Sequence, residues 1–384
     1  MQDQFTEVTS KGLFGRLGES IKSVAFGLLL FVIAFPVLFW NEGRTVKRMR
    51  TLESGAKQVI SIKADAVVPG NQGKLVHLTG DAKTEENVYD GDFGVQVNAI
   101  KLIRNAEMYQ WKERAESKTR KKIGGGEETT TEYKYEKVWS KDLIKSGDFK
   151  HPEGHDNRGS MPYESKTFTA KTVTIGAFTL SPGLIEKITK SEPLALDEDA
   201  LGPLPPDMRP SVRISEGGFY IGKDPAAPLI GDMKIRFEIV KQPIAISLLS
   251  GQVESTFEPF KMKEGVIDVL KVGTFTADAM FQMEKEANSL IAWVLRLVGF
   301  LMMVFGITMI FKPLTVTADV LPFLGDMLEM GIGFFAAIIS FALSLLTISI
   351  AWVFYRPLLG IPLLVIAIGS IVAFKMLGKK KKAA

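Results

Sequence analysis

Residues 290–311 read LIAWVLRLVGFLMMVFGITMIF, residues 330–355 read MGIGFFAAIISFALSLLTISIAWVFY, and residues 357–374 read PLLGIPLLVIAIGSIVAF. A helix that crosses a bilayer needs about 20 mostly apolar residues, and each of these runs is close to that length or longer. No charged residue lies between Glu329 and Arg356. A soluble core does not hold three such runs, so each run is predicted to be a transmembrane helix.

A fourth apolar run, Val24–Trp40, follows a basic N-terminal stretch, which is also the pattern of a secretory signal peptide. This run ends in the bulky residues Phe35–Trp40, and no small-x-small cleavage site follows. The pattern therefore favours an uncleaved anchor. Apolar residues at helical spacing just upstream indicate that residues 1–23 form an amphipathic N-terminus at the membrane surface.

Four spans put both chain termini on one side of the membrane and residues 41–289 on the other. Lys and Arg close to the span ends are more numerous on the terminal side, which favours cytoplasmic termini. Residues 312–329 are then a cytoplasmic interfacial loop, and residues 375–384 are a basic cytoplasmic tail. We expect the bacterial inner membrane, with a periplasmic domain, for a prokaryotic chain. For a eukaryotic chain we expect the ER or inner nuclear membrane.

Composition excludes several classes of function. The chain of 384 residues has a net charge of +4, too small to indicate a nucleic-acid partner. It has no cysteine, which excludes disulfides, thiolate catalysis and cysteine metal sites. Only three histidines are available for proton transfer near neutral pH. We expect no cofactor and no metal.

Residues 41–289 are predicted to be a β-rich domain, which makes the chain an α+β membrane protein. Glu107–Arg114 and Thr131–Trp139 both alternate in polarity around a tip at Gly124–Gly126, which indicates a long antiparallel hairpin. The proline-rich residues 193–210 are a possible boundary between two lobes. Further strands are predicted at Lys74–Thr79, Thr167–Thr174, Phe178–Leu180, Phe219–Ile221, Met233–Val240, Gln252–Phe257 and Val266–Val272.

The candidates for a functional site are few. His151 and His155 lie with two carboxylates in one short loop, but Pro152 and Gly154 argue against a helix that would align them on a metal. His77, in a strand among apolar residues, is interpreted as structural. No nucleophile elbow, phosphate-binding loop or dinucleotide fingerprint is present, so no catalytic residue is assigned.

The membrane segments contain three polar features. Arg296 lies inside the second span, where it either extends to the nearer membrane surface or meets a partner within the bundle. Asn41, Glu42, Gly43 and Arg44 follow the first span, and we expect Glu42 and Arg44 to pair and to fix how the domain sits on the membrane. Tyr355, Arg356 and Pro357 form a tight connection between the last two spans, with Pro357 well suited to a first helical turn.

These motifs, in their order and spacing, resemble the TMEM43 (LUMA) family. The motifs are Trp40–Arg44, Gly73–His77, Glu107–Trp111, Tyr133–Tyr135 with Trp139, Gly154–His155, Gly183–Ile185, Gly231–Asp232 and Trp352–Leu358. The resemblance implies a four-span protein with a large luminal or extracytoplasmic domain. It also marks a cluster of motif residues in that domain, namely His77, Glu107, Tyr109, Trp111 and His155.

The animal members are regarded as self-associating scaffolds that organise membrane and nuclear-envelope partners, with no established enzymatic activity. This chain lacks a long Ser/Thr-rich leader, which favours a prokaryotic member. We therefore expect a non-enzymatic scaffold that binds membrane lipids, forms a homo-oligomer and has membrane or envelope protein partners. The alternatives are a channel or lipid-handling protein, which would need a polar path through the spans, and an enzyme that uses His77 with Glu107.

Overall fold

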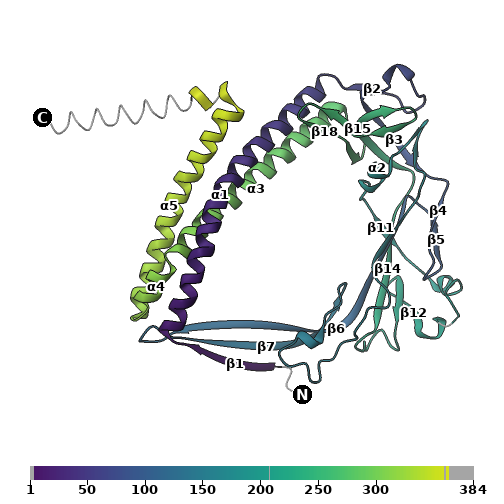
Figure 1. Ribbon diagram of the computed structural model, residues 1–384. Coiled ribbons are helices and arrows are strands. Elements are labelled where there is room, and N and C mark those ends of the chain that lie inside the picture. The colour runs from purple at the N-terminus through teal and green to yellow at the C-terminus, as the bar shows by residue number, and fades with distance from the viewer. Residues whose placement is uncertain (1–3, 207, 359, 363–384) are drawn as a thin grey trace.

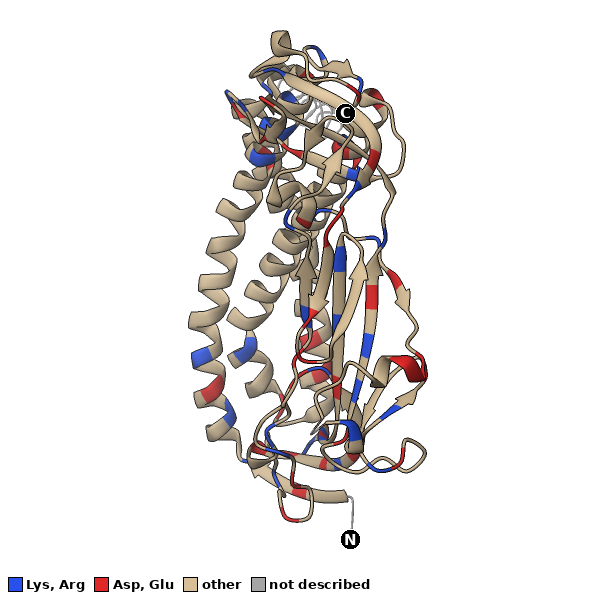
Figure 2. Cartoon of the chain, turned by 90° about the vertical axis from the view of Figure 1, so that its right-hand side faces the viewer, with Lys and Arg blue, Asp and Glu red and all other residues tan. Residues whose placement is uncertain are grey.

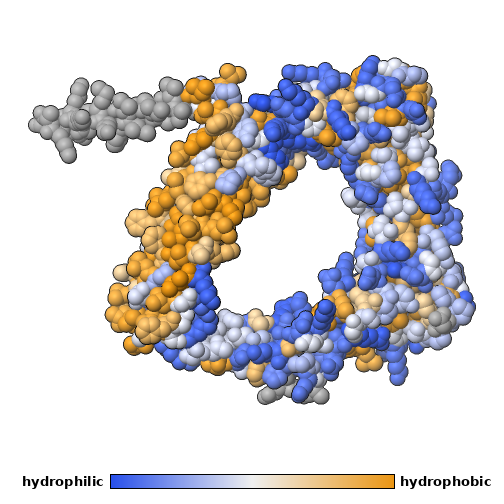
Figure 3. Space-filling model, in the orientation of Figure 1, coloured by the Kyte–Doolittle hydropathy of each residue, from blue (hydrophilic) through white to orange (hydrophobic). Residues whose placement is uncertain are grey.

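The computed structural model describes residues 4–206, 208–358 and 360–362. Long helices form one side of the molecule, two β-sheets form the opposite side, and a narrow group of strands joins them at the bottom (Figure 1). Figure 3 shows an opening through the middle of this frame. The apolar surface gathers on the helices, and charged residues concentrate in the β-sheets and at the helix ends (Figures 2 and 3).

Three helices are long and apolar enough to cross a membrane within the described residues: α1 (Leu13–Ala56), α3 (Ala277–Ile310) and α5 (Pro322–Tyr355). They contain the predicted spans 24–40, 290–311 and 330–355, apart from Phe311. The predicted loop 312–329 holds a short helix, α4 (Lys312–Ala318), and the first turns of α5. The predicted fourth span at 357–374 and the tail at 375–384 lie almost wholly outside the described residues.

Helices α1 and α3 pack closely and antiparallel because glycines lie at their contact. A Cβ built on Gly27 would lie 2.6 Å from the Cβ of Met309, and one built on Gly299 would lie 2.5 Å from the side chain of Leu38. Gly306 faces the carbonyl of Gly27 in the same way. Small residues let helix backbones approach closely in a membrane. The helix that Gly299 and Gly306 admit at close range is α1 of the same chain.

The β-rich domain is confirmed and consists of two main sheets. The eight-stranded sheet has the order β1-β7-β6-β14-β13-β12, with β11 on β14 and β8 on β6. Its strands are β1 (Gln4–Lys11), β6 (Lys101–Lys121), β7 (Glu127–Ser140), β8 (Lys166–Thr169), β11 (Glu192–Leu194), β12 (Val212–Ser215), β13 (Gly218–Ile221) and β14 (Met233–Val240).

The seven-stranded sheet has the order β10-β9-β3-β15-β16, with β19 on β15 and β2 parallel to β3. Its strands are β2 (Ile60–Ile62), β3 (Leu75–Lys83), β9 (Thr174–Ile175), β10 (Phe178–Thr179), β15 (Ile244–Val253), β16 (Thr256–Glu258) and β19 (Val269–Val272). Two separate hairpins are β4 (Asn87–Asp90) with β5 (Val95–Asn98), and β17 (Phe260–Met262) with β18 (Gly265–Ile267). The short helix α2 is Pro182–Glu186.

The strand predictions differ in their outcome. The long hairpin is confirmed as β6 and β7, and Met233–Val240 is β14. The strand predicted at Gln252–Phe257 is wrong, because the chain turns at Glu254, whose φ is 51°, between β15 and β16. Apolar content alone does not mark this turn.

The predicted boundary at 193–210 does not divide the domain into two lobes. Strand β6 pairs with β14, and β3 pairs with β15, so both sheets combine strands from before and after this segment. The buried side chains between the sheets, from Val76 to Leu270, form a single core. We call the two sheets without the extension described below the lobe.

The lobe is seated on one end of α1 and α3 through a second apolar cluster. Leu52 of α1 and Phe281 of α3 are almost completely buried against Leu75, Leu249 and Ile267 of the lobe. Each large apolar side chain buried in this way contributes about 1.5–3 kcal/mol. The lobe is therefore seated through apolar packing, and not through the pairing of Glu42 with Arg44 that the sequence predicts.

An extension of the first sheet reaches the other end of the helices. We call β1, β7 and the part of β6 that pairs with β7 the arm, and residues 121–127 the arm tip. At about 3.3 Å per residue, the 21 residues of β6 span about 70 Å. The 44 residues of α1 span about 66 Å at 1.5 Å each. Only part of this length belongs to the arm, which runs across the bottom of the frame from the lobe to the start of α1 (Figure 1).

The arm changes the expected distribution of the chain across the membrane. Residues 1–23 and 41–289 are predicted to lie on opposite sides, yet β1 pairs with β7 over its full length and leads through Gly12 directly into α1. Residues 4–11 and 127–134 are thus in one sheet, at the end of the helices that is distant from the lobe. The structure therefore does not show the predicted separation of residues 1–23 from residues 41–289.

Candidate functional site

A buried ion pair joins the two central helices. Arg296 of α3 donates through Nε to Oε1 of Glu42 at 2.6 Å and through Nη2 to Oε2 at 2.9 Å. Trp352 of α5 donates its indole N–H to the same carboxylate at 2.8 Å. Glu42 is 0% exposed and Arg296 is 15% exposed. A two-point contact of this kind compensates for much of the cost of burying both charges, and it links all three long helices.

Polar contacts continue along α1 and α3 on either side of this pair. Asn41 donates to the carbonyl of Ala292 at 3.0 Å, and Asn288 donates to the carbonyl of Thr45 at 3.0 Å. Arg44 donates to Oδ1 of Asn288 at 3.2 Å. These hydrogen bonds lie at several positions along the two helices and fix their register. Apolar packing alone would define the register less precisely.

Two predictions about these residues are corrected. Glu42 pairs with Arg296 instead of Arg44, because residues two apart on a helix do not face each other. Arg296 was first expected to reach the membrane surface, and instead it takes the alternative of a partner within the bundle. The partner lies 254 positions away in sequence, so no local pattern marks it.

The residues of the last connection also contact α1. The ring of Tyr355 lies against Gly43, where an added Cβ would be 2.5 Å from the ring carbon Cζ. The carbonyl of Tyr355 accepts a hydrogen bond from Arg50 at 2.9 Å. Arg356 lies over the ring of Trp352 at 5.9 Å, and Pro357 lines a pocket beside α1. This connection therefore holds the end of α5 against the exposed turns of α1 beyond Trp40.

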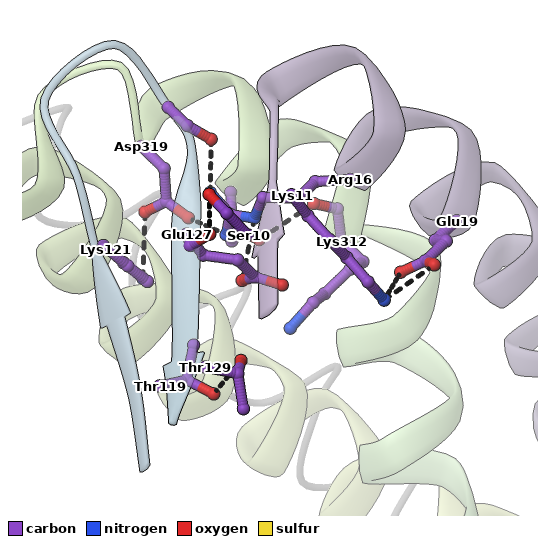
Figure 4. Close-up of polar contacts among 12 residues, drawn as sticks. Ser10, Lys11, Arg16, Glu19, Thr119, Lys121, Glu127, Thr129, Lys312 and Asp319 are labelled. Atoms are coloured by element: carbon purple, nitrogen blue, oxygen red, sulfur yellow. Dashed lines mark hydrogen bonds and ion pairs between the residues drawn. The ribbon is translucent and has the colours of Figure 1, made fainter. Parts of the chain in front are cut away.

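The arm tip is held by a second group of ion pairs, drawn in Figure 4. Arg16, only 7% exposed, contacts Glu127 of the arm at 2.9 Å and Asp319 at 2.5 Å, and it donates to the carbonyl of Gly125 at 2.7 Å. Lys121 of the arm contacts Asp319 at 2.9 Å and Asp326 at 2.7 Å. Burial acts to lower the pKa of Lys121, but its hydrogen bonds to the two aspartates outweigh burial and raise it.

The motif residues of the β-rich domain do not form one cluster. Trp111 and His155 meet with ring centroids 4.8 Å apart, and Tyr135 stacks on His155 at 4.0 Å. Tyr109 packs on Trp139 across the hairpin at 5.0 Å, where the two strands place these residues opposite each other. Glu107 faces Arg236 on the partly exposed surface.

His77 lies in the other sheet, near the seat of the lobe. Its Nε2 contacts the carbonyl of Phe275 at 2.9 Å and its Nδ1 contacts the hydroxyl of Ser61 at 3.2 Å. Because a carbonyl only accepts, Nε2 carries the proton and Nδ1 accepts from Ser61. Burial lowers the pKa of His77, and the Phe275 carbonyl offsets this only in part. His77 and Glu107 are on different sheets with separate partners, so the structure does not combine them in one site.

The described residues contain no group of three or more His, Asp or Glu side chains placed to hold a metal ion. His151, from the loop considered for metal binding, packs its ring on Phe5 at 4.0 Å, and the Nδ1 of His155 contacts the carbonyl of His151. The features with distinctive geometry are thus the helix polar cluster around Glu42 and the arm tip.

Comparison with known proteins places the chain in a family. The sequence model described as Transmembrane protein 43 matches residues 108–357. The chain is similar to human Transmembrane protein 43, with 33% identity over 362 residues that cover 90% of this chain and 88% of the human protein. It is also similar to the Drosophila melanogaster Transmembrane protein 43 homolog, with 28% identity over 372 residues that cover 91% of this chain and 94% of that protein.

No solved structure matches the chain. The three long apolar helices agree with the membrane character of these relatives. This chain is an integral membrane protein that belongs to the Transmembrane protein 43 (TMEM43) family.

Proposed function

We propose that this chain is a non-enzymatic, self-associating membrane scaffold that presents its β-rich domain to membrane or envelope partners. The observation that carries the proposal is the closed frame of helices, lobe and arm (Figure 1). A scaffold has to hold separate binding surfaces at fixed positions relative to the membrane, and a frame joined at both ends does this.

Each joint of the frame uses a different interaction. The lobe is seated through buried apolar side chains, including Leu52 and Phe281. The helices are joined by the Glu42–Arg296 ion pair. The arm tip is held by Arg16 and Lys121 on Asp319. The apolar seat is insensitive to salt, whereas exposed ionic contacts weaken as salt screens them. The seat and the buried helix pair therefore support a permanent arrangement.

The open edge of β1 supports self-association. Within the described residues β1 pairs with β7 alone, so its other edge presents unpaired backbone N–H and C=O groups from alternate residues of this eight-residue strand. Such an edge is a template for a strand of another molecule. Glu7 and Lys11, charged residues on this edge strand, limit unspecific pairing and still permit pairing with a matched second copy.

Native mass spectrometry of the full chain released from lipid nanodiscs tests this proposal. We expect two or more copies per assembly. Neighbouring residues of a strand direct their N–H groups to opposite edges. Of the variants Val8→Pro and Thr9→Pro, one therefore removes an N–H group from the open edge, and the other removes one from the edge that pairs with β7. The variant that alters the open edge should lower the copy number, and a single copy at every protein concentration contradicts self-association.

A channel or lipid-handling function is the second candidate for this membrane protein. Two of the α5 hydroxyls that would line a polar path contact neighbouring atoms instead: Ser344 lies 3.4 Å from the Sδ of Met303, and Thr347 donates to the carbonyl of Leu343 at 2.7 Å. These contacts favour a packing role for the hydroxyls. Ion flux into liposomes that disappears when Arg296 is replaced would favour the channel instead of the scaffold.

A further inference from the structure

A cationic pocket lies where α1 leaves its apolar segment. Six of its lining residues form one stripe on α1 at helical spacing: Trp40, Gly43, Arg44, Lys47, Arg48 and Thr51. The opposite wall is the β17–β18 turn at Glu264–Val266, and Tyr355 closes one end. The pocket has a volume of about 290 Å³, a size that suits a phospholipid headgroup rather than a whole lipid.

Two glycines keep the pocket open. An added Cβ at Gly43 would lie 2.5 Å from the ring of Tyr355, and one at Gly265 would lie 2.8 Å from the hydroxyl of Thr51. Larger side chains at either position would push into the space between α1 and its neighbours. The two helices and the lobe therefore leave room beside the basic stripe.

The charges that line the pocket are only partly compensated. Arg48 is paired with Glu284 at 2.8 Å, and Glu264 is paired with Arg50 at 3.3 Å. In the part of the chain that the structure describes, Arg44 has no carboxylate partner, and its buried Nε has no hydrogen-bond acceptor. Lys47, which is exposed, has no partner among the described residues. Two cations thus remain available to an anion.

Arg44 lies at the depth of the headgroup layer, and the long side chain of Lys47 can reach this layer from just above it. Arg44 and Lys47 follow Trp40 by four and seven residues, which is about 6 Å and about 10 Å along the helix axis. The headgroup layer extends about 5–8 Å beyond the hydrocarbon on each side of a bilayer. Trp40, which is 59% exposed, and Tyr355 are of the residue types that gather at this boundary.

We propose that this pocket binds the phosphate of an anionic phospholipid from the leaflet on the lobe side. Arg44 and Lys47 hold the phosphate, and the acyl chains lie along the apolar surface of α1 below Trp40. A zwitterionic choline headgroup suits the pocket less, because its quaternary ammonium would add a further cation beside Arg44, Lys47 and Arg48. This proposal does not depend on self-association.

The test uses the full chain in nanodiscs that contain equal amounts of phosphatidylglycerol and phosphatidylcholine, with retained lipids counted by native mass spectrometry. We expect retained phosphatidylglycerol to exceed phosphatidylcholine. Each cation near a membrane surface accounts for about a fivefold change in affinity for anionic lipid. Lys47→Gln should thus lower the ratio of retained phosphatidylglycerol to phosphatidylcholine about fivefold, and adding Arg44→Gln should lower it about 25-fold.

Lys57→Gln is the matched control, because Lys57 is an exposed lysine at the other end of the same basic segment and lies outside the pocket. It should leave the ratio unchanged. Lys47→Gln alters no contact within the described chain, so its effect is separate from folding. Equal retention of both lipids, or a ratio unchanged by Lys47→Gln, would overturn the proposal. Competition by inorganic phosphate as effective as that by added phosphatidylglycerol would also overturn it, by assigning the pocket to free phosphate.

Discussion

Arg296 and Glu42 meet across α3 and α1 through two hydrogen bonds of 2.6 Å and 2.9 Å, and Glu42 is completely buried. Among the described residues, neither side chain has a second partner of opposite charge. Removing one side of such a pair leaves the other charge buried and uncompensated, which costs about 3–5 kcal/mol.

We therefore expect Glu42→Gln to lower the free energy of unfolding by about this amount, measured by denaturant titration in detergent micelles. The control is Glu53→Gln, because Glu53 is exposed on the same helix and forms no ion pair with any described residue. The double variant with Met at both Glu42 and Arg296 should recover much of the loss, since no charge is then left buried. A Glu42→Gln protein as stable as the control would contradict a structural role for the pair.

Gly27 lies at the closest approach of α1 to α3, and Gly18 lies on the same helix with no other atom near its Cβ position. Gly27→Ala would place a methyl group 2.6 Å from the Cβ of Met309, so the helices must separate. We expect a loss of about 1–3 kcal/mol from overpacking. Gly18→Ala should be neutral or stabilising by up to about 1 kcal/mol, because alanine favours the helix. Equal melting temperatures for the two variants would argue against close packing at Gly27.

Leu52 and Phe281 secure the lobe to the helices. Leu52→Ala should cost about 2–5 kcal/mol and Phe281→Ala about 3–5 kcal/mol, because each leaves a cavity in the seat. Limited proteolysis between α1 and β2 measures the loosening directly, and we expect faster cleavage there. Leu229→Ala, at a site that is 59% exposed, is the control. Cleavage no faster than in the control would mean that other contacts hold the lobe.

The sequence predicts the features that depend on local pattern. The apolar runs within α1, α3 and α5 are visible because a span needs many consecutive apolar residues. Strand β14 and the long hairpin are visible through alternation with a glycine tip.

The rest depends on contacts between distant parts of the chain. Glu42 and Arg296 are each unusual beside an apolar run, but no pattern joins them. Strand β1 (QFTEVTSK) has too few apolar residues for its pattern to predict a strand. Its pairing with β7 makes it one. The pairing of β6 with β14 across the proline-rich segment likewise cannot be read locally, which is why two lobes were expected.

His77 makes the seat of the lobe sensitive to acid. Burial lowers its pKa below the ordinary value near 6.5, so the folded protein favours the neutral form. The stability that His77 contributes is complete above the unfolded pKa and is lost as pH falls below about 6.5 towards the lowered value. We expect the melting temperature of the lobe to fall between pH 7 and pH 5, and His77→Gln to reduce this dependence. A variant with the same pH profile as the natural chain would assign the effect to other groups.

The arm tip can be tested by a disulfide, since the chain has no cysteine of its own. A Cβ built on Gly125 would lie 3.4 Å from the Cβ of Leu13, close to the separation in disulfides. We expect cysteines at 13 and 125 to cross-link readily in detergent, even though the positive φ of Gly125 disfavours a side chain there. Cysteines at 13 and 147 are the control, because Gly147 has no atom near its Cβ position.

The same pair of cysteines reports how a bilayer affects the frame. The arm joins the lobe to the start of α1 near Arg16, so the lobe and the arm together connect the two ends of α1 outside the helix bundle (Figure 1). Strands with open backbone groups cannot lie in hydrocarbon. A flat bilayer around the apolar middle of α1 would have to be crossed by this β-rich side of the frame. We therefore expect the yield of the 13–125 cross-link to fall when the protein is moved from detergent into flat, extended bilayers. An undiminished yield there would mean that the frame stays closed in a flat bilayer, and it would contradict this expectation.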